Sequence, residues 1–116
     1  MEWADVVQPA IDIARGGFTV TPELREAIAY SYDVILENPE TAAIYLDEFG
    51  LVSEAGTVIH NDPLAKALEI IRDKGPEGLY SGQMAEAIVS TVQHSGGVMT
   101  LKDLENYECW EEEPVS

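Results

Sequence analysis

The sequence predicts an all-α fold: about six short amphipathic helices joined by tight turns, with one short β element. Two observations predict this. Apolar residues recur every three or four positions along most of the chain, as expected when one face of each helix is buried. Capping residues and glycines punctuate this pattern at short intervals, so that each helix has a defined start or end. We expect the 116 residues to form a single helical domain or subdomain, residues 1–116.

The first predicted helix carries apolar residues at helical spacing and ends at Gly16-Gly17. Pro9 lies inside this pattern and removes a backbone N–H donor. The helix is therefore expected to begin near Val6 or Val7, or to be kinked at the proline. The next residues, 18–20, are predicted to run in extended fashion.

Three later helix starts share one device, a capping residue followed by proline. The capping side chain accepts a hydrogen bond from a free backbone N–H, and proline presets the backbone angle at the first helical position. The pairs are Thr21-Pro22, Asn38-Pro39 and Asp62-Pro63. Apolar stripes after them predict helices over about residues 22–36, 39–49 and 63–74, and the last two end at Gly50 and Gly75.

The remaining segments are shorter. A turn at residues 54–57 and a short strand at 57–59 are predicted between the third and fourth helices. A helix begins at Ser81 or Gly82 and closes at Gly96-Gly97. A variant capping box, Thr100 with Asp103, starts a short last helix. Beyond it, the alternation of residues 107, 109 and 111 suggests the beginning of a strand.

The net charge is extreme, with 22 acidic residues against 6 basic ones and a formal value of −16. Nucleic acid is a poor partner, because phosphate binding requires clustered Lys and Arg. A membrane span is not expected either, since no apolar run approaches the roughly 20 residues that it needs, and membrane-surface binding is not expected because a basic amphipathic face is absent. The acidity has two interpretations. One is adaptation to high salt, which screens self-repulsion; the other is an acidic surface that docks on a basic partner or aids solubility.

No residue stands out as catalytic, cofactor-binding or metal-ligating, and no cofactor is implied. His60 and His94 lack the spacing of a metal-binding helix, and His94 fits a helix C-terminus, where the dipole favours a cation. A metal pair of His60 and Asp62 would need a third ligand. Cys109 is expected to be a small buried hydrophobe. Ser81 lacks the leading glycine of a nucleophile elbow, and the run Glu111-Glu112-Glu113 is expected to be solvated.

Several segments, in order, resemble the gamma-glutamyltranspeptidase family. They are residues 5–18 (DVVQPAIDIARGGF), 62–71 (DPLAKALEII), 75–82 (GPEGLYSG) and 96–104 (GGVMTLKDL), followed by Tyr107 and Glu113-Pro114. Leu79 stands where the family often has Phe. Residues 32–60 carry the weakest part of the resemblance.

The resemblance implies an N-terminal-nucleophile hydrolase of αββα architecture, which cuts itself into a large and a small subunit. The threonine that begins the small subunit attacks the gamma-glutamyl amide of glutathione and related compounds, its α-amine serving as base. Members are often exported. This chain matches a helical segment of the large subunit, so we expect a fragment that is inactive alone and whose partners are the rest of the large subunit and the small subunit.

No functional residue of the family falls on a position of this sequence, because the matched residues are caps, stops and packing positions. A rival hypothesis is therefore a free-standing acidic helical interaction module. A fragment should also expose apolar surface that its missing sheet would cover, which predicts self-association through the end around Cys109 and Trp110.

Overall fold

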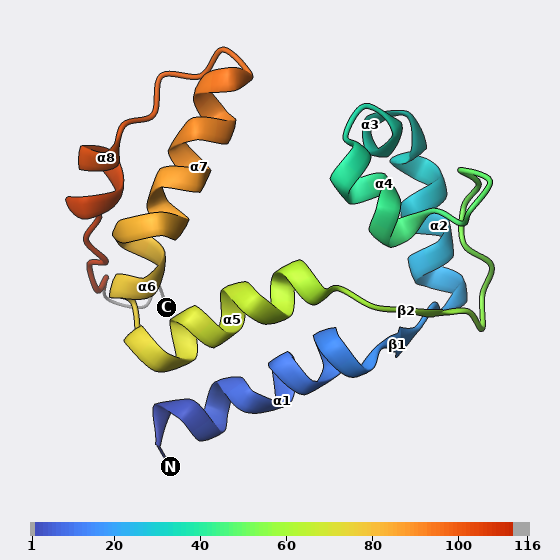
Figure 1. Cartoon of the computed structure of the whole chain (residues 1–116), viewed down its shortest axis with the longest axis horizontal. Helices are drawn as coiled ribbons and strands as arrows, with labels where there is room; N and C mark the ends of the chain where they lie inside the picture. Colours follow the sequence, from blue (N-terminus) through green and yellow to red (C-terminus); the bar gives the residue numbers. More distant parts are fainter. Residues whose placement is uncertain (1, 113–116) are drawn as a thin grey trace. The chain divides into compact units, whose positions relative to one another are not determined.

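The computed structural model describes residues 2–112, which form two compact units that divide between Leu68 and Glu69. The elements of the first unit are α1 (Trp3–Gly16), β1 (Phe18–Thr19), α2 (Pro22–Tyr30), α3 (Tyr32–Leu36), α4 (Pro39–Tyr45) and β2 (Val58–Ile59) (Figure 1). Helix α5 (Asp62–Lys74) begins in the first unit and ends in the second, which continues with α6 (Glu77–Tyr80), α7 (Gly82–His94) and α8 (Leu101–Glu105). The prediction of a mainly helical chain is confirmed. That it forms one helical subdomain stays a prediction.

The described residues hold eight helices rather than about six. The expected helix over 22–36 is interrupted at Ser31, whose backbone (φ −97°, ψ 11°) leaves the helical region and separates α2 from α3. Residues 77–80, which lie between two of the predicted helices, form the short helix α6. Both differences concern single turns, which hydrophobic periodicity does not resolve.

Helix α1 begins earlier than predicted. Its first turn starts at Trp3, because the Glu2 carbonyl accepts from the N–H groups of Asp5 (3.1 Å) and Val6 (3.4 Å). The Asp5 carboxylate in turn accepts from the Glu2 N–H at 3.4 Å. Pro9 therefore lies inside the helix, so its missing N–H leaves one helical carbonyl without its usual donor.

Helix α4 is shorter than predicted, ending at Tyr45 instead of running to Gly50. The Asp47 carboxylate accepts hydrogen bonds from the N–H groups of Phe49 (2.9 Å) and Leu51 (2.8 Å). A short acidic side chain that bonds nearby backbone offers an alternative to the helix. The chain then turns at Gly50, and Leu46 and Val52 form an isolated antiparallel bridge.

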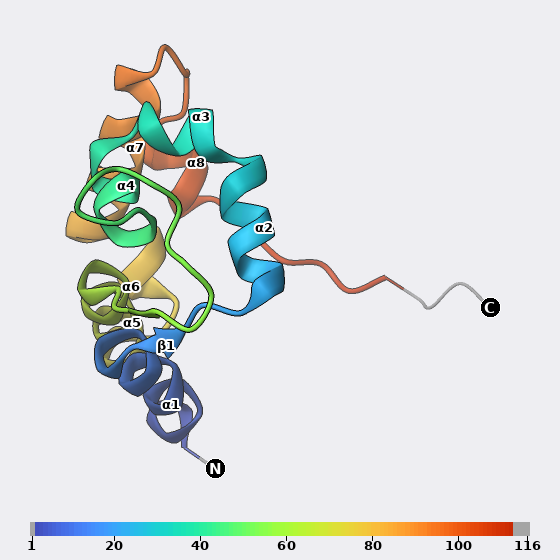
Figure 2. The same cartoon turned by 90° about the vertical axis from the view of Figure 1, so that its right-hand side faces the viewer.

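Two apolar clusters stabilise the first unit. One joins α1 to the start of α5, with Ala65 fully buried; its members are Val7, Ile11, Ala14 and Ala65, flanked by Leu68. The other joins α2, α3 and α4 around Ile28, Ile35 and Leu46. Figure 2 shows α2, α3 and α4 following one another above α1 and β1.

A two-stranded antiparallel ladder connects these parts of the first unit. Phe18 pairs with Ile59 and Thr19 with Val58. The short strand predicted at 57–59 is therefore present as β2. Val20, which is 1% exposed, extends the ladder because its N–H donates to the Thr57 carbonyl at 2.8 Å. The predicted turn at 54–57 is also present, closed by Thr57 N–H on the Glu54 carbonyl at 3.1 Å.

In the second unit α6, α7 and α8 follow one another through short turns. Ala85 and Val89 of α7 and Gly78 of α6 are buried. The predicted capping box at the start of α8 is confirmed: the Asp103 carboxylate accepts from the Thr100 N–H (2.7 Å) and hydroxyl (2.8 Å). No strand forms over residues 107–112, contrary to the alternation there. None of the helices is long and apolar enough to cross a bilayer, within the residues described.

Candidate functional site

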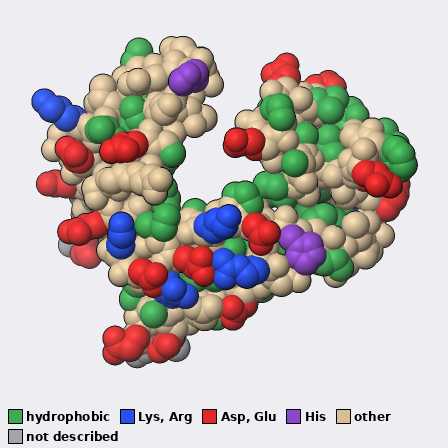
Figure 3. All heavy atoms as spheres, viewed as in Figure 1, with side chains coloured by type: hydrophobic (Ala, Val, Ile, Leu, Met, Phe, Trp, Pro, Cys, Tyr) green, Lys and Arg blue, Asp and Glu red, His purple; other side chains and the backbone are tan. Residues whose placement is uncertain are grey.

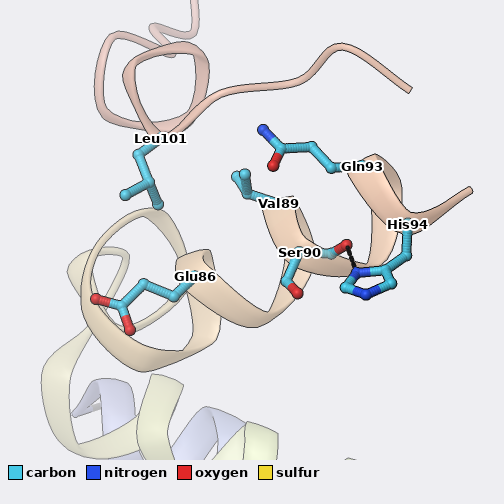
Figure 4. Close-up of a pocket in the computed structure, with 6 residues that line it drawn as sticks. All are labelled: Glu86, Val89, Ser90, Gln93, His94 and Leu101. Carbon is cyan, nitrogen blue, oxygen red and sulfur yellow. Dashed lines mark hydrogen bonds between the residues drawn. The ribbon is translucent and has the colours of Figure 1, made fainter. Parts of the chain in front are cut away.

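A hollow of about 410 Å³ lies against α7 in the second unit. Its walls are Glu86, Val89, Ser90, Gln93, His94 and Leu101 (Figure 4). The first five recur at intervals of three and four residues, so they share one side of α7. In Figure 4, Leu101 of α8 and Val89 face each other across the hollow, while the polar side chains stand around it.

Two polar side chains of this hollow form hydrogen bonds with backbone carbonyls. The His94 Nδ1–H donates to the Ser90 carbonyl at 2.9 Å, one turn earlier in α7. Gln93 donates through Nε2 to the Met99 carbonyl at 2.8 Å and so holds the loop that leads to α8. Nucleophilic catalysis would require the imidazole to meet the serine hydroxyl, and here it bonds the backbone. His94 thus occupies the helix-end position predicted from the dipole.

His60 performs a similar task in the first unit. Its Nδ1 lies 3.0 Å from the Arg15 carbonyl, and the N–H of Asn61 donates to the Ala14 carbonyl at 2.8 Å. These two donors satisfy carbonyls at the C-terminal end of α1, which have no partner inside the helix. Among residues 2–112 no three His, Cys, Asp or Glu side chains come together as metal ligands.

Ser81 and Cys109, the two candidate nucleophiles of the sequence, lie in the second unit. The Ser81 hydroxyl donates to the Glu77 carbonyl at 2.8 Å, at the junction of α6 and α7. Cys109 is exposed, so the prediction of a buried cysteine is wrong. A hydrogen bond with Cys109 raises the pKa of Tyr107, whose ring stacks on Tyr80 with centroids 5.4 Å apart.

The acidic end of the chain is only partly described. Glu111 and Glu112 are exposed, as expected of a solvated run, and Glu113 lies outside the described residues. The Glu112 carboxylate accepts from Trp110 Nε1 at 3.1 Å. Asp47, which lies within the helix predicted over residues 39–49, forms the turn after α4 instead.

Sequence reasoning did not single out Glu86, Ser90 or Gln93, which line the hollow on α7. A polar stripe on an amphipathic helix is the ordinary solvent face. The spacing of these residues therefore did not predict a hollow. The hollow forms only because α8 brings Leu101 against this side of α7.

The geometry of these residues does not by itself indicate a function, whereas comparison with known proteins identifies the family. The family model described as Gamma-glutamyltranspeptidase matches residues 1–116, the whole chain. The chain belongs to the gamma-glutamyltranspeptidase family. The resemblance drawn from the order of its sequence segments is thereby confirmed.

The relatives agree with this assignment. The chain is 35% identical over 108 residues to glutathione hydrolase 3 of Arabidopsis thaliana, covering 93% of this chain and 17% of that protein. It is 37% identical over 110 residues to the glutathione hydrolase proenzyme of Bacillus subtilis (strain 168), covering 95% and 18%. The chain thus spans less than a fifth of the length of these two curated relatives.

Solved structures show the same fold. The gamma-glutamyltranspeptidase of Helicobacter pylori superposes with a TM-score of 0.87 at 26% identity, over 93% of this chain and 31% of that one. A cephalosporin acylase from Bacillus halodurans superposes with a TM-score of 0.85 at 26% identity, over 99% and 22%. The fold of this chain therefore recurs as part of these two longer chains.

Proposed function

We propose that this chain is a helical part of the large subunit of an enzyme that transfers or hydrolyses gamma-glutamyl groups. The observation that carries the proposal is the family match along all 116 residues, combined with relatives named glutathione hydrolase. The substrate class proposed for the whole enzyme is a gamma-glutamyl amide of the glutathione type. An acylase substrate is the alternative within the same scaffold, because a cephalosporin acylase shares this arrangement.

In this proposal the chain supplies scaffold and no reacting group. Gln93 and His94, which line the hollow on α7, are bonded to backbone carbonyls, and Thr21 and Asn38 cap the helices that follow them. The family resemblance implies that the attacking threonine, and the arginine that grips the substrate carboxylate, have no counterpart among these residues. The chemistry would then depend on a threonine whose own amine acts as base and on backbone donors for the oxyanion.

The partners proposed are the remaining parts of the parent enzyme. The described residues contain one two-stranded ladder, whereas an αββα fold has two stacked sheets. We propose that the parent supplies those sheets and that the helices of this chain lie outside them.

Assaying the purified chain for release of the aniline from a gamma-glutamyl anilide tests the catalytic part of the proposal. We expect no turnover, with the Bacillus subtilis glutathione hydrolase as positive control under the same conditions. Measurable turnover that persists through repeated purification and follows the chain in a sizing column would refute it.

A segment exchange tests the structural part. Residues 1–112 of this chain would replace the matched segment of the Bacillus subtilis proenzyme, and a glycine-serine linker of equal length would replace it in the control. We expect self-cleavage into two subunits with this chain and none with the linker. Equal behaviour of the two would show that the segment is not required for the parent fold.

The second candidate function is an acidic interaction module that acts without gamma-glutamyl chemistry. The observation that favours it is the formal charge of −16. The coding sequence on either side discriminates the two candidates. Flanking segments that encode the family arginine and a threonine-led small subunit favour the enzyme part, and ordinary start and stop signals without them favour the module.

Self-association through the end around Cys109 and Trp110 is also a proposal. Trp110 is 79% exposed and Tyr107 is 58% exposed, and exposed aromatic surface often drives association. Sedimentation velocity should show a concentration-dependent dimer that the Trp110→Ser variant loses. A clean monomer at high concentration would count against it.

A further inference from the structure

A groove in the first unit runs along one side of α4. Hollows of about 660 Å³ and about 420 Å³ share Ala43, Ile44 and His60 as lining residues, so they adjoin along this helix. We call them together the α4 groove. Its first part is completed by Glu40, Thr41, Asp62 and Pro63, and its second part by residues 46–47, 53–54 and 57–59.

The α4 groove has an apolar floor that solvent still reaches. Ile44 is half-buried, Leu46 and Ile59 are buried, and Pro63 is exposed beside them. The apolar surface contributed by the exposed and half-buried members is available to an occupant. Removing such surface from water favours association, roughly in proportion to the area covered.

The rim of the α4 groove is acidic at both ends. Glu40 and Asp62 line one end, and Asp47 and Glu54 line the other. Arg25 neutralises Glu54 through an ion pair of 3.0 Å. Within the described residues, no ion pair of this kind engages Glu40 or Asp62, and both side chains are exposed.

This rim belongs to a long stretch without basic side chains. Residues 26–65 contain no Lys or Arg and eight acidic residues, namely Glu26, Asp33, Glu37, Glu40, Asp47, Glu48, Glu54 and Asp62. On the face seen in Figure 3, the part of the surface over α3 and α4 shows acidic and hydrophobic side chains and no Lys or Arg. Residues 26–65 thus carry a net charge of −8, half of the chain's −16, and four of their acidic residues line the groove.

We propose that the α4 groove binds a basic amphipathic segment of a partner protein. Apolar side chains of that segment would cover the floor around Ile44, and Lys or Arg side chains would meet Glu40 and Asp62. Amphipathic segments bind apolar grooves in this way, and complementary charge fixes orientation and speeds encounter. A second copy of this chain is disfavoured as occupant of this groove, because it has only 6 basic residues against 22 acidic ones to place against the acidic rim. The proposal does not depend on gamma-glutamyl chemistry.

Fluorescence anisotropy with the full chain tests the proposal. The probe is a labelled helical peptide of about 14 residues made of Leu, Lys and Ala, with its Leu residues on one face and its Lys residues flanking them. We expect saturable one-to-one binding at physiological salt. A peptide of the same composition, scrambled so that the Leu residues share no face, should bind at least about tenfold more weakly. Equal binding of the two peptides would overturn the proposal.

Two charge-reversed variants separate the groove from general attraction to an acidic protein. Glu40→Lys/Asp62→Lys changes the groove, whereas Glu105→Lys/Glu108→Lys makes the same change in net charge on exposed positions of the second unit. We expect the groove variant to lose about tenfold or more in affinity, because like charges would face each other, and the control to lose less than about twofold. Equal losses in the two variants would overturn the proposal.

The apolar floor has its own test. Ile44→Ser should weaken peptide binding without changing the salt dependence of what binding remains. Circular dichroism of each variant checks that α4 is retained, and the charge-reversed pair decides the matter if Ile44→Ser unfolds. A dimer of the unmodified chain that is lost in Ile44→Ser, together with no peptide binding, would assign the groove to a second copy instead.

Discussion

Gly17 and Val58 approach each other so closely that no side chain at position 17 would fit. A Cβ atom on Gly17 would lie 2.6 Å from Val58 Cγ1 and 2.8 Å from His60 Cε1. Gly17 also has a φ of +94°, which residues with a Cβ rarely adopt. The glycine that ends α1 thus also permits the contact between that helix end and the β2 segment.

Replacing Gly17 by Ala should therefore destabilise the first unit by about 1–3 kcal/mol, since it combines a backbone penalty with a steric clash. Gly16→Ala is the matched control. A Cβ there meets no atom within 4 Å and the residue is helical, so the control should be neutral or stabilising by up to about 1 kcal/mol. Urea unfolding followed by circular dichroism measures both. Equal effects of the two variants would contradict the close approach to Val58 as the cause.

The capping residue of α5 is Asn61 rather than the predicted Asp62. The Asn61 Oδ1 accepts from the Leu64 N–H at 3.0 Å, and Asp62 is the first residue of the helix. Asn61→Ala should therefore cost about 1 kcal/mol. Asp62→Ala should cost less, about 0.3–1 kcal/mol, because its charge only interacts with the helix dipole. A larger loss for Asp62→Ala in urea unfolding would favour the assignment predicted from sequence.

Sequence reasoning located most helices because caps and stops are local. The Thr21 and Asn38 caps do what their position before proline predicts: Thr21 Oγ1 accepts from Leu24 N–H at 3.2 Å, and Asn38 Oδ1 from Thr41 N–H at 3.0 Å. The error at Asp62 arose because two adjacent residues both qualify as caps. Only the tertiary bond from Asn61 N–H to the Ala14 carbonyl, 47 positions earlier in the chain, fixes which one begins the helix.

Exposure is harder to predict than secondary structure. From sequence, Tyr30 and Tyr32 are both expected to pack at the edge of the core. Tyr30 is 95% exposed, whereas the Tyr32 hydroxyl donates to the Gly50 carbonyl at 2.7 Å and its ring packs on the second cluster. Residues two apart do not share one face of a helix, and only Tyr32 meets the cluster. The α4 groove also escaped prediction, because its lining residues come from segments that are separate in the sequence and meet only in the fold.

The contact between α1 and α5 should be a major source of stability for the first unit. Ile11 is 1% exposed in the cluster with Ala65, whereas Ile13 is 57% exposed on the same helix. Ile11→Ala should cost about 2–5 kcal/mol, because it leaves a cavity. Ile13→Ala should change the free energy of unfolding by about 0.5 kcal/mol or less. Denaturant unfolding of both variants checks this, and similar losses would place Ile13 in an interface.

The stability that the capping box gives to the start of α8 should depend on pH. Hydrogen bonds from the Thr100 hydroxyl and then the Thr100 N–H lower the pKa of Asp103. A carboxylate whose pKa is lower in the folded state stabilises it above the unfolded pKa of about 3.9, and this contribution is lost as pH falls through the folded pKa. Asp103→Asn should therefore lower the urea midpoint near neutral pH and differ less from the parent chain toward pH 2.

Thr100→Ala is the control for that experiment, because it removes the hydroxyl donor while keeping the carboxylate. It should reproduce part of the loss at neutral pH and show a similar convergence at low pH. A gap between Asp103→Asn and the parent that stays constant from neutral pH to pH 2 would mean that the ionised form of Asp103 gives no extra stability.

Salt should stabilise this chain if its acidity reflects adaptation to concentrated salt. With 22 acidic residues against 6 basic ones, repulsion opposes the compact state, and the screening length falls from about 10 Å at 0.1 M to about 3 Å at 1 M salt. We expect the melting temperature to rise in KCl from dilute to molar concentration. A variant with Glu37, Glu48 and Glu108 changed to Gln should gain less from salt. A melting temperature that is the same in dilute and molar KCl would reject adaptation to salt, leaving solubility or the docking of a basic partner to account for the charge.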